Sequence, residues 1–115
     1  VGSARSEADA VAVARAVARS NLFKCAMFGE DPNWGRIVSA VGTADAEFDP
    51  EALGVVINGL PVCRDGAAFG DPTQADLSGR EIVVEIDLDA GDAVGHVWTN
   101  DLTTEYVHEN SAYST

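Results

Sequence analysis

The sequence predicts an α+β fold of two layers, in which helices pack on one face of a small, mostly antiparallel sheet. In the first part of the chain, two segments carry apolar residues at helical spacing, and from residue 54 onward the spacing changes to strand-like alternation. An Asn-Gly pair, which favours a tight hairpin, lies in this second part. Helices followed by a run of strands are typical of α+β folds. A length of 115 residues suits a single domain, residues 1–115.

A first helix is predicted over residues 7–20. Ser6 is the expected N-cap, and Asp9 stands at the third helical position, as in a capping box. The residues that recur at helical spacing are Ala10, Val11, Val13, Ala14, Val17 and Ala18. The many alanines predict close packing against another element.

Residues 22–28 form a short apolar run that predicts a strand or an extended connector ended by Gly29. A turn at Asp31-Pro32 then leads to a second helix over residues 34–41, with Asn33 as its N-cap. One face of this helix is apolar and consists of Trp34, Ile37, Val38 and Val41. Gly42 is a suitable residue to end it.

The strands are expected to begin at residues 55–57, followed by the hairpin turn Asn58-Gly59 and a return over residues 62–64. Pro61 lacks an amide hydrogen, which makes the return strand an edge or a bulge. Residues 65–76 are rich in Gly, Ala and Asp and predict a loop.

A half-buried strand is predicted next, because apolar and acidic residues alternate. The apolar members are Ile82, Val84, Ile86 and Leu88, and the acidic ones are Glu81, Glu85 and Asp87. Residues 95–99, which include Trp98, are expected to be its pairing strand. Thr103 is placed to cap a last short helix that contains Tyr106 and Val107.

The composition excludes some classes of partner. A net charge of −12 argues against nucleic acid and anionic membranes, which both need basic surface. No apolar run reaches the ~20 residues of a membrane span, and no signal peptide is visible. Cys25 and Cys63 lack the spacing of a metal site or a disulfide framework, so no metal or cofactor is predicted and we expect the reduced thiols of a cytoplasmic protein. The chain starts at Val1 and reads like a piece of a longer polypeptide.

The residues alone do not predict catalysis. No Gly-x-Ser-x-Gly element is present, and the glycines at 29, 35 and 42 do not match a phosphate-binding loop. On this basis the chain is an α+β domain without an active site of its own.

A longer pattern resembles a known family. Its most specific part is the run Asp31-Pro32-Asn33-Trp34-Gly35-Arg36 within residues 22–38. The strand region 83–92 and the chain end from Thr99-Asn100-Asp101-Leu102-Thr103 to Asn110-Ser111-Ala112-Tyr113-Ser114-Thr115 agree with the same family. In order and spacing, the chain is similar to the C-terminal part of the β chain of the ornithine acetyltransferase/N-acetylglutamate synthase family of arginine biosynthesis.

The resemblance implies a glutamate N-acetyltransferase that transfers acetyl from N-acetylornithine to glutamate by a ping-pong acyl-enzyme route. Some members of the family also use acetyl-CoA. Such enzymes are precursors that cut themselves before a threonine, which then becomes the nucleophile. The nucleophile and the oxyanion-hole donors are expected upstream of Val1, so this chain is not expected to be catalytic alone. The implied partners are the α chain and the remainder of the β chain in a hetero-oligomer.

The resemblance also implies two substrate-binding residues, Asn110 and Thr115. An Asn amide offers donors and an acceptor, and Thr115 offers a hydroxyl. For Asn33, Trp34 and Arg36 we favour a structural role over substrate contact: a cap, a core residue and a surface or inter-chain ion pair.

Two other readings stay open. One is a non-catalytic interaction or regulatory module that docks through its acidic face and hairpin edge. The other is a related N-terminal-nucleophile amidohydrolase. Lys24 is expected to be a solvated charge, and Thr103 and Thr104 are expected to be caps rather than nucleophiles.

Overall fold

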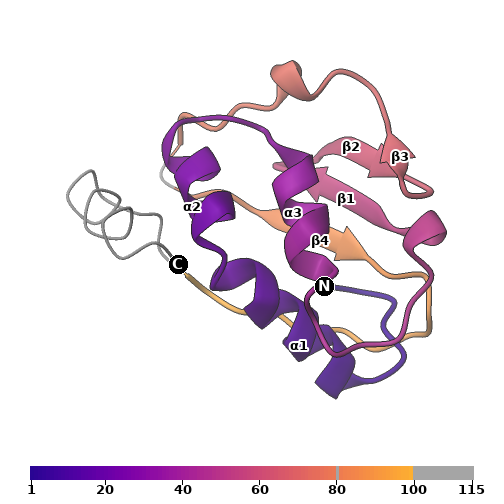
Figure 1. Ribbon diagram of the computed structural model, residues 1–115. Coiled ribbons are helices and arrows are strands. Elements are labelled where there is room, and N and C mark those ends of the chain that lie inside the picture. The colour runs from indigo at the N-terminus through magenta and orange to yellow at the C-terminus, as the bar shows by residue number, and fades with distance from the viewer. Residues whose placement is uncertain (80, 100–115) are drawn as a thin grey trace.

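The computed structural model describes residues 1–79 and 81–99. Three helices, α1 (Glu7–Ala18), α2 (Asn21–Phe28) and α3 (Trp34–Val41), gather on one side of a four-stranded sheet (Figure 1). The strands are β1 (Gly54–Ile57), β2 (Leu60–Arg64), β3 (Ala67–Ala68) and β4 (Val84–Asp87), in the order β3-β2-β1-β4 with every pair antiparallel. Two short 3-10 helices, η1 (Pro50–Ala52) and η2 (Pro72–Gln74), lie in the connections. The predicted two-layer α+β fold is confirmed.

Helix α1 begins as predicted, because the Ser6 hydroxyl accepts a hydrogen bond from the Asp9 amide at 3.1 Å. The Asp9 carboxylate turns to a distant segment and accepts from the Glu47 amide at 3.2 Å. It also pairs with Arg5, whose Nε lies 3.2 Å from the same oxygen. The buried alanines of α1, as expected from their number, let neighbouring elements approach closely: they are Ala10, Ala14 and Ala16.

The prediction of a strand or extended connector over residues 22–28 is wrong, because this segment is helix α2. The Ser20 hydroxyl caps the helix by accepting from the Phe23 amide at 3.2 Å. Phe23, Ala26 and Met27, spaced i, i+3 and i+4, form one buried face. Residue Gly29 ends the segment, as predicted.

Helix α3 has the predicted bounds, and the predicted cap is present: Asn33 Oδ1 accepts from the Arg36 amide at 3.2 Å. Trp34 packs against the core, partly buried. Arg36 Nη1 donates to the Leu22 carbonyl at 2.9 Å, and the predicted ion pair with another chain stays a prediction. The motif residues thereby join the start of α3 to the start of α2.

The hairpin of β1 and β2 turns at Asn58 and Gly59, whose φ values of 48° and 80° suit a type I′ turn. The register shifts between Val55 and Val56, opposite Pro61, so the predicted proline irregularity is a bulge. The strand β2 is not at the edge, because β3 pairs with it. The predicted loop over residues 65–76 thus contains β3 and η2.

Strand β4 confirms the predicted alternation, since Ile86 and Leu88 are buried while Glu85 and Asp87 are exposed. Its predicted partner is wrong. The strand pairs with β1, and residues 95–99 form no strand. The predicted helix after Thr103 lies outside the described residues.

Candidate functional site

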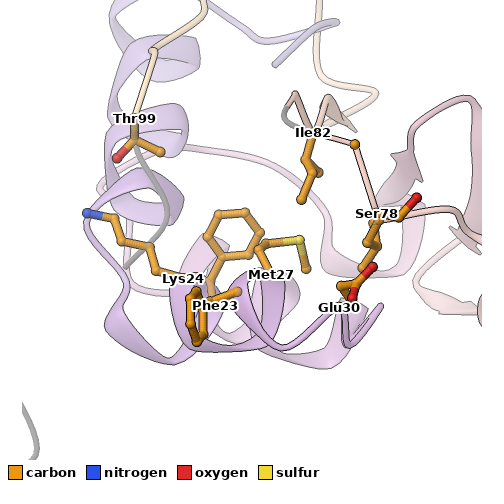
Figure 2. Close-up of a pocket in the computed structure, with 10 residues that line it drawn as sticks. Phe23, Lys24, Met27, Glu30, Ser78, Ile82 and Thr99 are labelled. Atoms are coloured by element: carbon orange, nitrogen blue, oxygen red, sulfur yellow. The ribbon is translucent and has the colours of Figure 1, made fainter. Parts of the chain in front are cut away.

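The two predicted substrate-binding residues, Asn110 and Thr115, lie outside the described residues. Thr99 is the last residue described before them, and it lies at the wall of a hollow of about 380 Å³. Helix α2 and Glu30, residues 77–79, Ile82 and Thr99 line this hollow (Figure 2). We name it the α2 pocket; its lining residues are Phe23, Lys24, Met27, Phe28, Glu30, Leu77, Ser78, Gly79, Ile82 and Thr99.

The floor of the α2 pocket is apolar and its ends are charged. Phe23 and Met27 are almost fully buried and face Ile82 across the hollow. Lys24 extends along one side, toward Thr99, and Glu30 lies at the other, beside Ser78 (Figure 2). One cationic and one anionic side chain thus flank an apolar floor.

The end of α2 fixes the position of Glu30. The Glu30 amide donates to Met27 O at 3.1 Å and the Asp31 amide donates to Ala26 O at 2.8 Å, the bond pattern of a Schellman motif. The left-handed residue of this motif is usually glycine, but here Glu30 occupies it with φ of 55°. A non-glycine residue in this conformation costs roughly 1 kcal/mol. The strain is stored at a charged residue of the pocket, as is common at functional sites.

A hydrogen-bonded turn forms the opposite wall. Asp76 Oδ1 accepts from the Ser78 amide at 3.0 Å and from the Ser78 hydroxyl at 2.6 Å. These two bonds lower the pKa of the Asp76 carboxyl below its ordinary value of 3.8, because they stabilise the charged form. The Asn58 amide group donates to Asp76 O at 2.7 Å and so attaches this wall to the hairpin turn.

This arrangement suits a small molecule that carries both signs of charge. A Lys ammonium attracts a carboxylate, and a Glu carboxylate attracts an ammonium. Within residues 1–79 and 81–99, no group of three or more His, Cys, Asp or Glu side chains is placed to hold a metal ion. No helix in this part of the chain combines the length and the hydropathy needed to cross a membrane.

Sequence reasoning missed the α2 pocket because it took α2 for an extended segment. The available signal was Ser20, a good N-cap placed before Phe23, Lys24 and Met27. The contribution of Ser78 and Ile82 had no local signal, because tertiary packing brings these two residues to α2.

Comparison with known proteins identifies close relatives. The model of the ArgJ family matches residues 1–115. The "Arginine biosynthesis bifunctional protein ArgJ" of Thermobifida fusca is 56% identical over all 115 residues, and that of Streptomyces coelicolor is 55% identical over 114 residues. The chain spans 30% of the length of each of these two relatives.

A solved structure shares the fold. The crystal structure of the Bacillus halodurans protein titled "Arginine biosynthesis bifunctional protein argJ" matches with a TM-score of 0.82 at 28% identity. The match covers 97% of this chain and 55% of that one.

Proposed function

The chain belongs to the ArgJ family, and from that premise we propose that it is part of a cytoplasmic glutamate N-acetyltransferase that moves acetyl from N-acetylornithine to glutamate. The observation that carries the proposal is the 56% identity to an ArgJ protein over the whole chain. Because the chain spans 30% of that relative, the activity belongs to the longer protein.

The proposed route is covalent. A threonine hydroxyl outside this chain attacks the acetyl carbonyl of N-acetylornithine, and the tetrahedral intermediate collapses to an acetyl-threonine ester as ornithine leaves with a proton on its amine. The glutamate amine then attacks the ester carbonyl, which releases N-acetylglutamate and returns the proton to the threonine oxygen. Donors that stabilise the oxyanion belong to the same outside part, in the α chain and the remainder of the β chain.

This chain is proposed to supply substrate binding. N-acetylornithine and glutamate both carry carboxylates, and ornithine and glutamate carry ammonium groups. The α2 pocket offers Lys24 and Glu30 to these two kinds of group, above the apolar floor of Phe23 and Met27. Residues 100–115, with Asn110 and Thr115, follow directly from Thr99 at the pocket wall.

The test uses the complete, self-processed enzyme. Lys24→Met and Glu30→Gln should each raise the KM for a substrate about tenfold or more, equivalent to at least about 1.4 kcal/mol of binding, with self-cleavage intact. Removal of residues 110–115 should impair substrate use in the same way. The control is Glu51→Gln, an exposed acidic residue on η1 away from the pocket. Unchanged kinetics in all three test variants would refute the assignment of the binding residues.

The reaction itself is tested separately. N-acetylornithine supplied with glutamate should yield N-acetylglutamate in step with ornithine. Release of free acetate at the same rate without glutamate would favour an amidohydrolase. A longer protein that shows neither reaction would favour an interaction or regulatory module.

A further inference from the structure

Residues 1–4 form a short segment between two others, and it bends at Ser3, whose φ is 52°. On one side, the Gly2 amide donates to Ile86 O at 2.8 Å and the Leu88 amide donates to Gly2 O at 3.2 Å. On the other side, Ala4 and Ala93 exchange two backbone bonds of 2.9 Å. The segment is therefore parallel to β4 and antiparallel to residues 93–95.

The bonding on the β4 side stops partway along the strand. Residues of a strand alternate in the direction of their backbone groups, and Val83 bonds to Asn58 on the β1 side. Val84 and Ile86 therefore turn their N–H and C=O groups to the opposite edge. Gly2 uses Ile86 O, whereas Ile86 N, Val84 N and Val84 O have no backbone partner among the described residues.

The hydrogen bonding to residues 93–95 also ends at Val1. Val1 and Gly95 exchange bonds of 2.8 and 2.9 Å, so the backbone groups of Gly95 face the segment. Val97, two residues on, has no backbone partner for its N–H and C=O in residues 1–79 and 81–99, and an extended chain turns these groups the same way as those of Gly95. Two rows of hydrogen-bonding groups thus face each other beyond Val1, on β4 and on residues 96–98.

A hollow of about 140 Å³ lies beneath these two rows. Val17 and Ala18 of α1 line one side, and Val84, Ile86 and Val97 line the sides that carry the open backbone groups. The end of the described chain, orange to yellow in Figure 1, runs past α1, and His96 to Thr99 line this hollow. Apolar side chains and unpaired backbone groups together are what an inserted strand needs.

We propose that this slot holds an extended strand of the longer protein that leads into Val1, parallel to β4 and antiparallel to residues 95–99. The chain spans only 28–30% of its relatives' length, so there is chain to supply the strand. The Val1 amine already donates where a peptide amide would donate. Burial lowers the pKa of this amine, with Glu85 acting in the opposite direction, so the position favours a neutral group.

The slot specifies the pattern of the inserted strand. Side chains that point to α1 enter the apolar hollow, so alternate residues are apolar. Those between them point to the face that carries the exposed carboxylates of Glu85 and Asp87, so they are polar or basic. Each residue of the inserted strand pairs with one residue of the β4 segment. Roughly five residues are therefore needed to extend the pairing from Val1 as far as Ile82.

The proposal goes beyond the proposed activity, and its test needs no catalysis. About eight residues, enough for one strand, are added before Val1 from the corresponding stretch of the Thermobifida fusca relative. Amide hydrogen exchange at Val84, Ile86 and Val97 should slow at least tenfold in the lengthened chain. Val83, which already bonds toward β1, is the internal control and should not change.

A matched control segment has the same composition but exchanges each apolar residue with its polar neighbour. It points polar side chains at α1 and should leave exchange at the three amides as it is in the 115-residue chain. A second variant, Val97→Pro, removes an amide that faces the slot. It should lower the thermal midpoint by roughly 4–8 °C more in the lengthened chain than in the 115-residue chain.

Three outcomes would overturn the proposal. The first is equal exchange with the native and the control segments. The second is slow exchange in the 115-residue chain that depends on protein concentration, which would assign the slot to a second copy. The third is slow exchange that disappears when residues 100–115 are removed, which would assign the slot to the chain's own end. Folding of the lengthened chain where the 115-residue chain fails to fold would support the proposal.

Discussion

Asn58 and Val83 are joined by two hydrogen bonds, although 25 residues separate them in sequence. The backbone amide of Asn58 donates to Val83 O at 2.8 Å, and the backbone amide of Val83 donates to the side-chain Oδ1 of Asn58 at 2.7 Å. The side-chain Nδ2 of Asn58 reaches on to Asp76 O. One turn residue therefore fixes both ends of the segment that forms a wall of the α2 pocket.

We expect Asn58→Gly to lower the free energy of unfolding by about 1–2 kcal/mol. Glycine keeps the left-handed turn, so the loss reports the side-chain bonds, at roughly 0.5–1.5 kcal/mol each. Urea denaturation measures the loss, and faster amide exchange at Ser78 should accompany it. Asn58→Asp, which keeps Oδ1 and loses Nδ2, should lie between glycine and the native residue. A glycine variant as stable as the native chain would show that these bonds contribute nothing.

Glu30→Gly should raise the free energy of unfolding by about 0.5–1 kcal/mol. Glycine adopts the φ of 55° at this position without the steric cost that Glu30 bears. In the complete enzyme the same variant should lose substrate affinity, because the pocket loses its carboxylate. Glu30→Gln is the control, since it removes the charge and keeps the strain. Higher stability together with native kinetics would separate the strain from any binding role.

Gly66→Ala should cost about 3 kcal/mol or more, whereas Gly59→Ala should cost about 1–2 kcal/mol. The two glycines have similar φ values, 74° and 80°. A Cβ atom on Gly66 would lie within van der Waals overlap of Pro50 O, whereas one on Gly59 meets no atom within 4 Å. The difference between the two variants in thermal or urea unfolding isolates the clash from the backbone strain. Equal losses would indicate that η1 shifts to make room.

Cys63 should make stability fall as the pH rises above 9.0. The thiol is buried and its Sγ lies 3.6 Å from Leu53 O. Burial raises its pKa above the ordinary 9.0, so the unfolded chain loses this proton first. The stabilisation is complete below pH 9.0 and is lost as the pH rises toward the folded-state pKa, by at most about 1.4 kcal/mol per pH unit.

Unfolding free energies measured from pH 8 upward check this slope. Cys63→Ala should be less stable at every pH but should lack the fall that Cys63 contributes. Cys25→Ala retains Cys63 and should keep that fall. Parallel pH profiles for the native chain and Cys63→Ala would contradict the prediction.

Prediction from the sequence succeeded where the signals were local. Asn33 and the apolar face of residues 34–41 determine helix α3 within one short segment. The Asn58-Gly59 pair determines its hairpin in the same way, since its turn demands left-handed residues.

It failed where partners distant in sequence decide the conformation. The segment 22–28 has an apolar run that suits either structure, and the Ser20 cap together with packing of Phe23 and Met27 against the core favours the helix. Residues 95–99 have the alternation of a strand, but Val1 bonds to Gly95 while Gly2 bonds to Ile86, so the start of the chain separates them from β4. The α2 pocket was missed for the same reason, because residues far apart in sequence line it.

The pairing of Val1 with Gly95 also has a consequence for synthesis. The two residues are 94 positions apart, so the first residues must wait until almost all of the described chain has left the ribosome. At about 5–20 residues per second, this delay is roughly 5–20 s. Helices α1 to α3 contain only local hydrogen bonds and can form during it, whereas the segment before them stays unpaired. Co-translational folding of this domain should therefore end with the pairing of Val1 and Gly2, which are made before its helices and strands.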